Sequence, residues 1–192
     1  MRSPSVPLAR LRAGRSFVVE VAAVRREPGA RRRLALEGVV EGLEVSGSHV
    51  PAGRSVRFDG LLEALHGGVL VTGTVRAPWE GPCRRCLEPA GGELVVAVRE
   101  WCVEAGDPDT TYPLGPDELD LEPVVHDACI LNLPLAPLCR EGCRGLCPAC
   151  GANRNLERCG CAPGRDQRWA VLASLAGGRS TGAPGDATRE DD

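Results

Sequence analysis

The sequence contains no lysine, and aromatic side chains make up only 3% of its 192 residues. All 23 basic residues are therefore arginine, which a GC-rich genome explains without any special function. The formal net charge is −3 at pH 7, so no overall positive potential attracts the chain to nucleic acid. Trp79, Trp101 and Trp169 are more simply interpreted as core residues than as surfaces for stacked bases. Composition alone therefore does not indicate a nucleic-acid-binding protein.

A long apolar run is also missing near the N-terminus. The segment Phe17–Val24 is interrupted by Glu20 and is too short for a signal-peptide core or a membrane span. We therefore expect a cytoplasmic protein with no membrane partner. Thiols stay reduced in that compartment, so clustered cysteines usually bind metal or take part in catalysis rather than form disulfides.

Residues 1–104 predict a β-rich core. Four segments are rich in β-branched or alternating apolar residues and are bounded by turns that contain glycine or proline: 15–24, 55–65, 67–79 and 91–104. No helical segment connects them, so antiparallel pairing is favoured over a parallel sheet. Five arginines form a basic run around a predicted turn in the same region, namely Arg25, Arg26, Arg31, Arg32 and Arg33.

Residues 105–136 predict an acidic loop followed by a helix that packs on the core. The helix is expected over 120–133, with Asp120 as its N-cap and Pro134 after its end. Pro123 is tolerated because the first turn has N–H groups without partners in any case. The apolar face of this helix is predicted to contain Leu121, Val124, Val125, Ala128 and Leu131.

Residues 137–176 predict a cysteine-rich metal-binding segment that ends in a short helix over 165–175. Residues 177–192 contain almost no apolar side chains and predict a disordered tail. The fold class expected is therefore α+β and β-rich. It consists of an antiparallel sheet or a partly open barrel, one or two packing helices and a C-terminal zinc-binding segment.

Six of the ten cysteines lie between residues 138 and 161, among residues that are unsuited to a hydrophobic core: Cys139, Cys143, Cys147, Cys150, Cys159 and Cys161. The string CPACG is typical of a zinc knuckle, in which two thiolates lie two residues apart and a glycine supplies an unusual backbone angle. Zinc takes four ligands in a tetrahedron. Either the first four of these cysteines or the last four satisfy it, so the sequence predicts zinc without assigning its ligands.

A second pair, Cys83 and Cys86, lies between two predicted strands, and three interpretations remain open. The pair is a thioredoxin-like redox site, half of a metal site completed by two C-terminal cysteines, or a turn with packed sulfurs. The redox interpretation lacks the βαβ context that it requires. Cys102 and Cys129 are most simply small buried apolar residues.

An enzyme is not indicated. His49, His66 and His126 lie in no recognisable metal or catalytic pattern, and no glycine-rich phosphate loop precedes a helix. The carboxylates between Asp117 and Glu122 are explained by an acidic helix N-terminus. We therefore expect no catalytic residues and no small-molecule substrate.

One ordered set of motifs resembles a known family. The string CRRCLEP follows a strand; an acidic loop, the long string from DELDLEPVV to CPACGANRN and a closing RWAVLASL come after it. Together they resemble the YceD family of large ribosomal RNA subunit accumulation proteins over residues 60–176. Arg154 replaces an expected leucine, and RDQRWAVL is an altered form of the closing motif. Some relatives lack the C-terminal cysteines, which implies that a metal there is structural.

The resemblance implies a non-enzymatic factor for accumulation of 23S rRNA and assembly of the large ribosomal subunit. Its expected partner is a precursor of that subunit, bound through rRNA or a ribosomal protein. Arg140, Arg144 and Arg154 are the candidate RNA contacts, although charge alone is equally consistent with solvated arginines. The alternatives are a thiol redox enzyme that uses Cys83 and Cys86, or a zinc-stabilised adaptor that binds protein.

Overall fold

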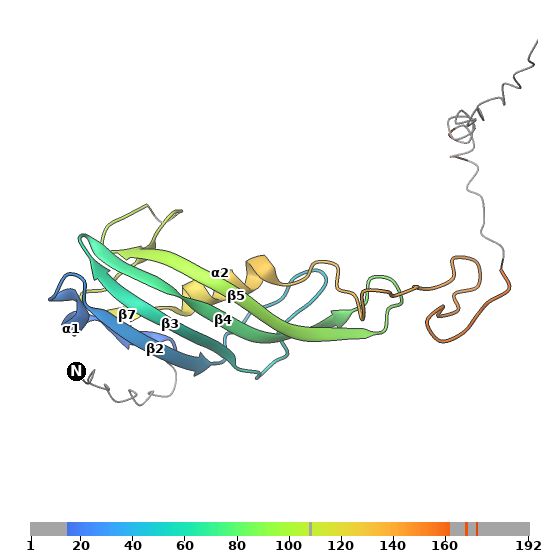
Figure 1. Ribbon diagram of the computed structural model, residues 1–192, viewed down its shortest axis with the longest axis horizontal. Coiled ribbons are helices and arrows are strands. Elements are labelled where there is room, and N and C mark those ends of the chain that lie inside the picture. The colour runs from blue at the N-terminus through green and yellow to red at the C-terminus, as the bar shows by residue number, and fades with distance from the viewer. Residues whose placement is uncertain (1–14, 108, 162–167, 169–171, 173–192) are drawn as a thin grey trace, which may run out of the picture. The chain divides into compact units, whose positions relative to one another are not determined.

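A computed structural model describes residues 15–107, 109–161, 168 and 172 of the chain (Figure 1). It divides the chain into two compact units between Gly145 and Leu146, a boundary inside the predicted segment 137–176. The predicted short helix over 165–175 lies outside the described residues apart from Arg168 and Leu172, and the predicted tail lies wholly outside them.

The first unit contains seven strands and two helices among its described residues. They are β1 (Val18–Glu20), α1 (Ala22–Arg25), β2 (Arg31–Gly38), β3 (Val56–Leu65), β4 (Gly68–Pro82), β5 (Pro89–Val103), β6 (Tyr112–Pro113), β7 (Glu118–Asp120) and α2 (Glu122–Asn132). Neither helix has the length and hydrophobicity that crossing a membrane requires.

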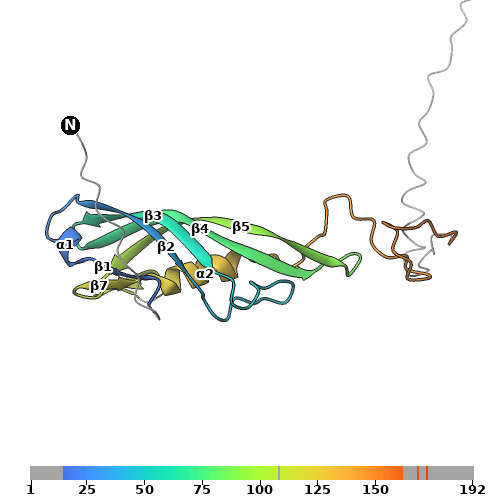
Figure 2. The same ribbon diagram turned by 90° about the horizontal axis from the view of Figure 1, so that it is seen from below.

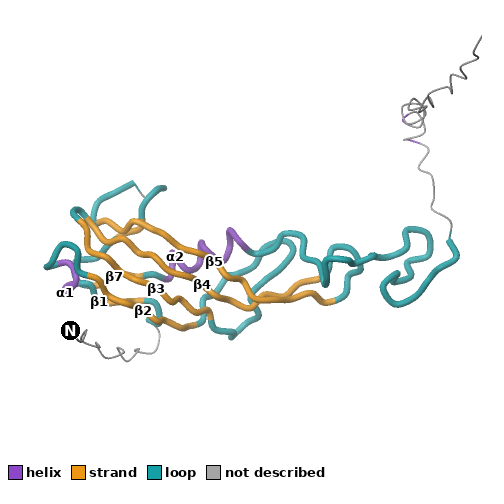
Figure 3. The backbone as a smooth tube through the Cα atoms, in the orientation of Figure 1, coloured by secondary structure: helices purple, strands orange, loops and turns teal. Residues whose placement is uncertain are grey.

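The main sheet has five strands in the order β2-β3-β4-β5-β6, and a smaller sheet pairs β1 with β7. All pairs are antiparallel except β5 with β6, and the main sheet is not closed into a barrel. The β-rich α+β fold predicted from the sequence is confirmed in its open-sheet form. Figure 3 shows the strands β2 to β5 running alongside one another in the first unit, joined by turns and loops.

The hairpin of β4 and β5 is the longest element, and it extends beyond its neighbours. Its register runs from Val69 opposite Cys102 to Pro82 opposite Pro89. Strand β3 pairs with β4 only as far as Arg57 opposite Arg76, and beyond that point His49 forms an isolated antiparallel bridge with Glu80 of β4. The turn that contains Cys83 and Cys86 therefore lies at the tip of a projecting hairpin.

The hydrophobic core lies between one face of the main sheet and α2. Figure 2 shows α2 along that face. The alternation predicts one face with Val69, Val71, Val75 and Ala77 on β4 and with Leu94, Val96 and Val98 on β5. All of these side chains are buried except Val96, which is partly buried, and Cys102 of β5 is buried as well. From α2, the buried side chains are Val124, Val125 and Cys129. The helix thus packs on the sheet as expected.

Two local predictions were wrong. Leu131 was expected on the buried face of α2, but 81% of it is exposed. Leu131 lies two turns after Val124 on the same side of the helix, in its last turn. That side is the edge of the buried face, and helical spacing alone does not set how wide the buried face is. The strand expected over 15–24 is limited to Val18–Glu20, because Ala22–Arg25 turn into the short helix α1.

The start of α2 is close to expectation. Asp120 does not occupy the N-cap position, which is Leu121. Its carboxylate nevertheless accepts a hydrogen bond from the N–H of Glu122 at 2.9 Å, so it satisfies one of the N–H groups that the first turn leaves without partners. Pro123 lies in that first turn, as expected.

We expect Gly73→Ala to lower the free energy of unfolding by about 1–3 kcal/mol, as overpacked cores do. A Cβ at Gly73 would lie 2.6 Å from the carbonyl oxygen of Asp59 and 2.7 Å from the ring of Phe58, which is fully buried. Urea denaturation followed by circular dichroism measures the effect. Gly142→Ala is the control, because its Cβ would meet no atom within 4 Å, and equal stability of the two variants would contradict the prediction.

Candidate metal centres

Four cysteines of the first unit meet at the tip of the β4–β5 hairpin, and we call this cluster the first centre. Cys83 and Cys86 come from the hairpin turn, while Cys139 and Cys143 come from the segment after α2. The Sγ atoms of Cys83 and Cys143 are 3.8 Å apart, and those of Cys86 and Cys139 are 3.6 Å apart. The four sulfurs lie within 4.8 Å of one another.

Two hydrogen bonds to backbone carbonyls place the segment after α2 beside the hairpin turn. The hydroxyl of Ser48 donates to the carbonyl of Pro134 at 2.8 Å, which fixes the chain as it leaves α2. The N–H of Arg84 donates to the carbonyl of Pro137 at 2.9 Å, directly before Cys139. The segment after α2 is thereby brought alongside the hairpin, and its cysteines reach the hairpin turn.

The loop that contains Cys143 is also anchored to the hairpin turn. The N–H of Cys143 donates to the carbonyl of Arg140 at 3.1 Å and closes a tight turn. The guanidinium of Arg85 donates to the carbonyl of Cys143 at 2.9 Å. Gly145, at φ +71°, passes so close to Arg85 that a Cβ would lie 3.0 Å from its carbonyl oxygen. A side chain at Gly145 would therefore disturb the centre.

Four cysteines of the second unit form the second centre: Cys147, Cys150, Cys159 and Cys161, with all sulfurs within 4.8 Å of one another. The N–H of Cys147 donates to the carbonyl of Ala152 at 2.8 Å. An antiparallel bridge joins Leu146 to Asn153 around the same turn. This centre is built entirely from a segment of fifteen residues, 147–161.

The two centres use the same knuckle. In the first, the N–H of Cys83 donates to the carbonyl five residues on, at 2.8 Å, and the N–H of Leu87 donates back to the carbonyl of Cys83 at 2.9 Å. In the second, Cys147 makes the same bond five residues on, at 2.8 Å, and Gly151 donates back at 2.9 Å. Both knuckles need a left-handed residue after their second cysteine, and Gly151 supplies it with φ +76°.

Leu87 occupies the corresponding position in the first knuckle with φ +63°. It is the one residue other than glycine with a positive φ among the described residues. A left-handed backbone costs a residue with a Cβ about 1–2 kcal/mol relative to the ordinary helical region.

The two centres differ in burial. Cys83 is fully buried, and Cys86 and Cys143 are each 3% exposed, whereas Cys139 is exposed. In the second centre only Cys147 is buried. The first centre is thus largely shielded from solvent, and the second is open to it.

Both clusters fit a tetrahedral metal ion. Four thiolates about 2.3 Å from a zinc ion are separated by about 3.8 Å along each edge of the tetrahedron. The distances of 3.8 and 3.6 Å in the first centre match that edge and are far too long for a disulfide. Two four-cysteine groups that could hold a metal ion are therefore present, whichever metal binds.

The ionisation of the first centre also favours a cation. Burial raises the pKa of Cys83, but backbone N–H groups of Cys139, Arg85 and Cys86 act in the opposite direction and bring that pKa down to about 6. Although Cys139 as a residue is exposed, lost hydration around its sulfur and the neighbouring thiols raise its pKa to about 12. Cys83 therefore loses its proton readily, whereas Cys139 does not. A cation bound between the sulfurs would favour the thiolate form of all four cysteines.

The second centre behaves in the same way. Backbone N–H groups of Cys150 and Ala149 lower the pKa of Cys147 to about 6. Interactions with the sulfurs of Cys150 and Cys147 raise the pKa of Cys161 to about 12. In both centres, backbone N–H groups thus favour the thiolate of the first knuckle cysteine; for Cys83 they include that of Cys139 from the other segment, and for Cys147 they come from the knuckle itself.

Of the groupings left open by the sequence, the structure brings together Cys147, Cys150, Cys159 and Cys161, and it does not join Cys139 and Cys143 to Cys147 and Cys150. Sequence reasoning did not specify that Cys139 and Cys143 pair with Cys83 and Cys86. The signal was the repeated Cys-x-x-Cys knuckle, which appears in both CRRC and CPAC. Two knuckles indicate two centres.

The remaining cysteines and the candidate arginines are placed as follows. Cys102 and Cys129 are fully buried in the core, as predicted, and burial raises the pKa of Cys129 to about 11. Arg140 and Arg144 lie on the first unit beside the first centre, whereas Arg154 belongs to the second unit. Their proposed contact with RNA stays a prediction.

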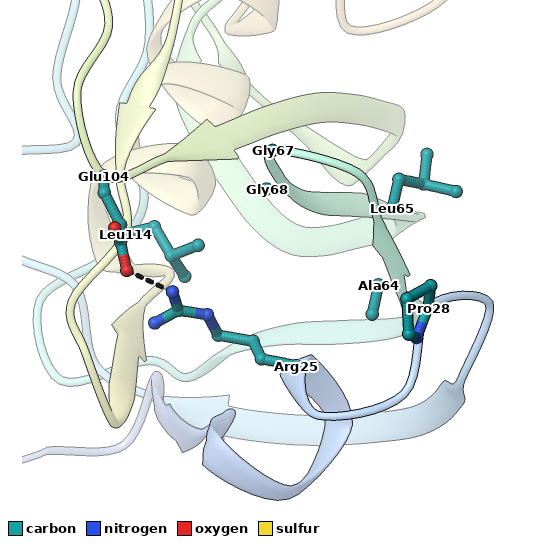
Figure 4. Close-up of a pocket in the computed structure, with 8 residues that line it drawn as sticks. All are labelled: Arg25, Pro28, Ala64, Leu65, Gly67, Gly68, Glu104 and Leu114. Carbon is teal, nitrogen blue, oxygen red and sulfur yellow. Dashed lines mark hydrogen bonds and ion pairs between the residues drawn. The ribbon is translucent and has the colours of Figure 1, made fainter.

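The described residues contain no better candidate for a site. A cavity of about 190 Å³ lies between α1, the β3–β4 turn and the end of β5 (Figure 4). The guanidinium of Arg25 at its wall is already bound by Glu104 and by the carbonyls of Gly115 and Pro116 at 3.0 and 2.8 Å. The residues that line this cavity include no nucleophile, and its two charged side chains, Arg25 and Glu104, form an ion pair with each other.

The histidines do not form a catalytic group either. His49 pairs with Glu80 at 3.2 Å, and His126 pairs with Asp127 at 3.2 Å. The carboxylate of Asp127 also accepts a hydrogen bond from the hydroxyl of Tyr112 at 2.9 Å. None of these side chains lines the cavity at α1, and they are explained as surface pairs.

Comparison with known proteins identifies one matching family and several similar proteins. The model of the family described as large ribosomal RNA subunit accumulation protein YceD matches residues 71–176. An uncharacterized protein of Mycobacterium tuberculosis is 35% identical over 191 residues, which cover 91% of this chain and 88% of that protein.

Two plant proteins match over shorter stretches, and both are named large ribosomal RNA subunit accumulation protein YCED homolog 1, chloroplastic. The Zea mays protein is 33% identical over 81 residues, covering 38% of this chain and 28% of its own length. The Arabidopsis thaliana protein is 32% identical over 57 residues, covering 30% and 17%. No solved structure matches the chain significantly.

We expect purified protein to contain two metal ions per chain, one in each four-cysteine centre. Native mass spectrometry of protein purified without chelators counts them. Replacing Cys83 and Cys86 by serine should remove one ion, and replacing Cys159 and Cys161 should remove the other. Cys102→Ser is the control that leaves both. A wild-type chain without metal and with eight freely titratable thiols at these positions would contradict the prediction.

Proposed function

The chain belongs to the YceD family of large ribosomal RNA subunit accumulation proteins, and on that premise we propose that it acts in accumulation of 23S rRNA and assembly of the large ribosomal subunit. The support is the family match over residues 71–176, together with the names of the two plant relatives. The proposed partner is a precursor of the large subunit, and the proposed location is the cytoplasm.

We propose zinc as the resident metal of both centres. Four thiolates in a tetrahedron are the donor set of structural zinc sites and leave no open position for a substrate. Zinc bound there would supply a crosslink without redox chemistry. In the first centre that crosslink would join the hairpin turn to segments 53 and 60 residues further along the chain. Closing so long a loop removes many unfolded conformations, so the first centre would stabilise the whole first unit.

The proposed role is non-enzymatic. Support comes from the small cavity at α1, whose arginine is already paired, and from four-thiolate centres that are fully coordinated when metal is bound. A protein of this kind acts by binding, so its contribution to the ribosome is to hold or protect a particular surface of the precursor. No small-molecule substrate is required.

The alternative of a thiol redox enzyme is weakened by the surroundings of Cys83 and Cys86. Thiol–disulfide exchange requires an accessible attacking sulfur, yet Cys83 is fully buried and Cys86 is 3% exposed. Two further cysteine sulfurs also lie within 4.8 Å, which a two-cysteine redox mechanism does not need.

We expect cells that lack the gene to accumulate less 23S rRNA relative to 16S rRNA, and to show fewer mature large subunits in a sucrose gradient. The tagged protein should sediment with large-subunit precursors in wild-type cells. A plasmid copy with Cys102→Ser is the control that restores the profile. An unchanged rRNA ratio in the deletion strain, with the protein remaining at the top of the gradient, would contradict the proposed function.

Replacing Cys83 and Cys86 by serine should lower the free energy of unfolding by about 3–5 kcal/mol, because it removes a structural metal. Thermal and urea denaturation measure the change, and an insulin-reduction assay tests the alternative. The expected result is lost stability with no reductase turnover in either protein. A wild-type turnover that the double change abolishes would establish the redox enzyme instead.

A further inference from the structure

Leu87 is out of place in two respects. Its backbone is left-handed at φ +63°, in a position where the second knuckle uses Gly151. Its side chain is 66% exposed, so the strained backbone does not direct it into the core. Backbone strain that persists without a packing benefit is typical of sites that contact another molecule.

The knuckle itself does not require this leucine. Its hydrogen bonds from Cys83 to Glu88 and from Leu87 to Cys83 are made by backbone atoms. The second knuckle makes the same two bonds with a glycine in the corresponding position. Glycine would therefore serve the fold at least as well, and the side chain of Leu87 is left without a structural role.

Arginines are adjacent to the cysteines of the first centre, because each of three cysteines is followed directly by one: Arg84 after Cys83, Arg140 after Cys139 and Arg144 after Cys143. Arg85 is the fourth, and it precedes Cys86. All four residues are exposed, although Arg85 also donates to the carbonyl of Cys143. The same two loops contain two carboxylates, those of Glu88 and Glu141.

The arginines are more accessible than most of the sulfurs. Cys83, Cys86 and Cys143 are buried, whereas Cys139 and the four arginines are exposed. A molecule that approaches from solvent can therefore contact guanidinium groups and a leucine beside the centre. Guanidiniums bind phosphate oxygens in paired hydrogen bonds, and an apolar side chain fits against the face of an unpaired base.

We propose that Arg84, Arg85, Leu87, Arg140 and Arg144, which we call the knuckle tip, form a binding surface for single-stranded RNA of the large-subunit precursor. This inference rests on the proposed function and names the part of the protein that performs it. Leu87 contacts a base while the arginines contact the neighbouring phosphates. The metal centre fixes both loops in advance, so binding requires little further ordering.

The first test is Leu87→Gly in the full-length, metal-loaded protein. Glycine relieves the left-handed strain, so the melting temperature should stay within about 3 °C of wild type and both metal ions should remain. Filter binding to transcribed 23S rRNA should weaken by about fivefold, because the apolar contact is lost. Leu131→Ala is the matched control, since Leu131 is 81% exposed on α2.

The second test replaces Arg84 and Arg140 by alanine. Each phosphate contact to single-stranded RNA contributes about 0.7 to the slope of log affinity against log salt, so the slope should fall by about 1.4. Arg33→Ala with Arg99→Ala is the matched control, because both of these arginines are exposed on the sheet. Unchanged stability and metal content in all variants exclude misfolding as the cause.

The outcomes separate this inference from the proposed function. Weaker RNA binding by both knuckle-tip variants, with both controls unchanged, supports the inference. Wild-type protein that binds precursor particles but not their deproteinised RNA would overturn it in favour of a ribosomal protein partner. Knuckle-tip variants that bind RNA as well as wild type would overturn it alone. Wild-type protein that binds neither particles nor RNA would overturn the proposed function as well.

Discussion

The structure of the first unit depends on bringing four thiols together from segments more than fifty residues apart. Cys83 and Cys143 are 60 residues apart in sequence, and their sulfurs lie 3.8 Å apart in space. Four thiolates at that spacing would repel one another, and a cation bound among them would remove that repulsion. The length of the β4–β5 hairpin and the course of the chain after α2 both bring the four sulfurs together. Near its tip the hairpin is otherwise supported by the bridge between His49 and Glu80.

Much of the fold could be predicted because local patterns determine it. The alternation in β4 and β5 identifies their buried faces, and Pro123 and Pro134 bracket α2. The errors arise where long-range packing decides. Leu131 has the spacing of a buried residue, but it lies at the edge of the face that Val125 and Cys129 define, and spacing alone does not set the width of the covered face. The segment 15–24 has the composition of a strand, yet only Val18–Glu20 finds a partner, in β7.

The cysteines show the same division. Each knuckle is a local motif, so CRRC and CPAC are recognisable from five or six residues. The choice of the second pair for each knuckle is not local. Cys139 and Cys143 lie nearer in sequence to Cys147 than to Cys83, and only the hairpin and α2 bring them to the other knuckle. Sequence spacing therefore predicted that these cysteines form a four-thiol site, but it left open which cysteines share one, and zinc as the bound metal stays a prediction.

The two knuckles are alike in their hydrogen bonds and differ in what surrounds them, which suits them to different tasks. The second centre closes fifteen residues of its own segment, so its metal can order little beyond that segment. The first centre joins the turn between β4 and β5 to the segment after α2, and three of its four cysteines are buried. A rigid, shielded centre can present exposed side chains at constant geometry, whereas a flexible loop would have to order them on binding. If the protein acts by binding, as proposed, the loops held by the first centre are therefore well suited to contact a partner.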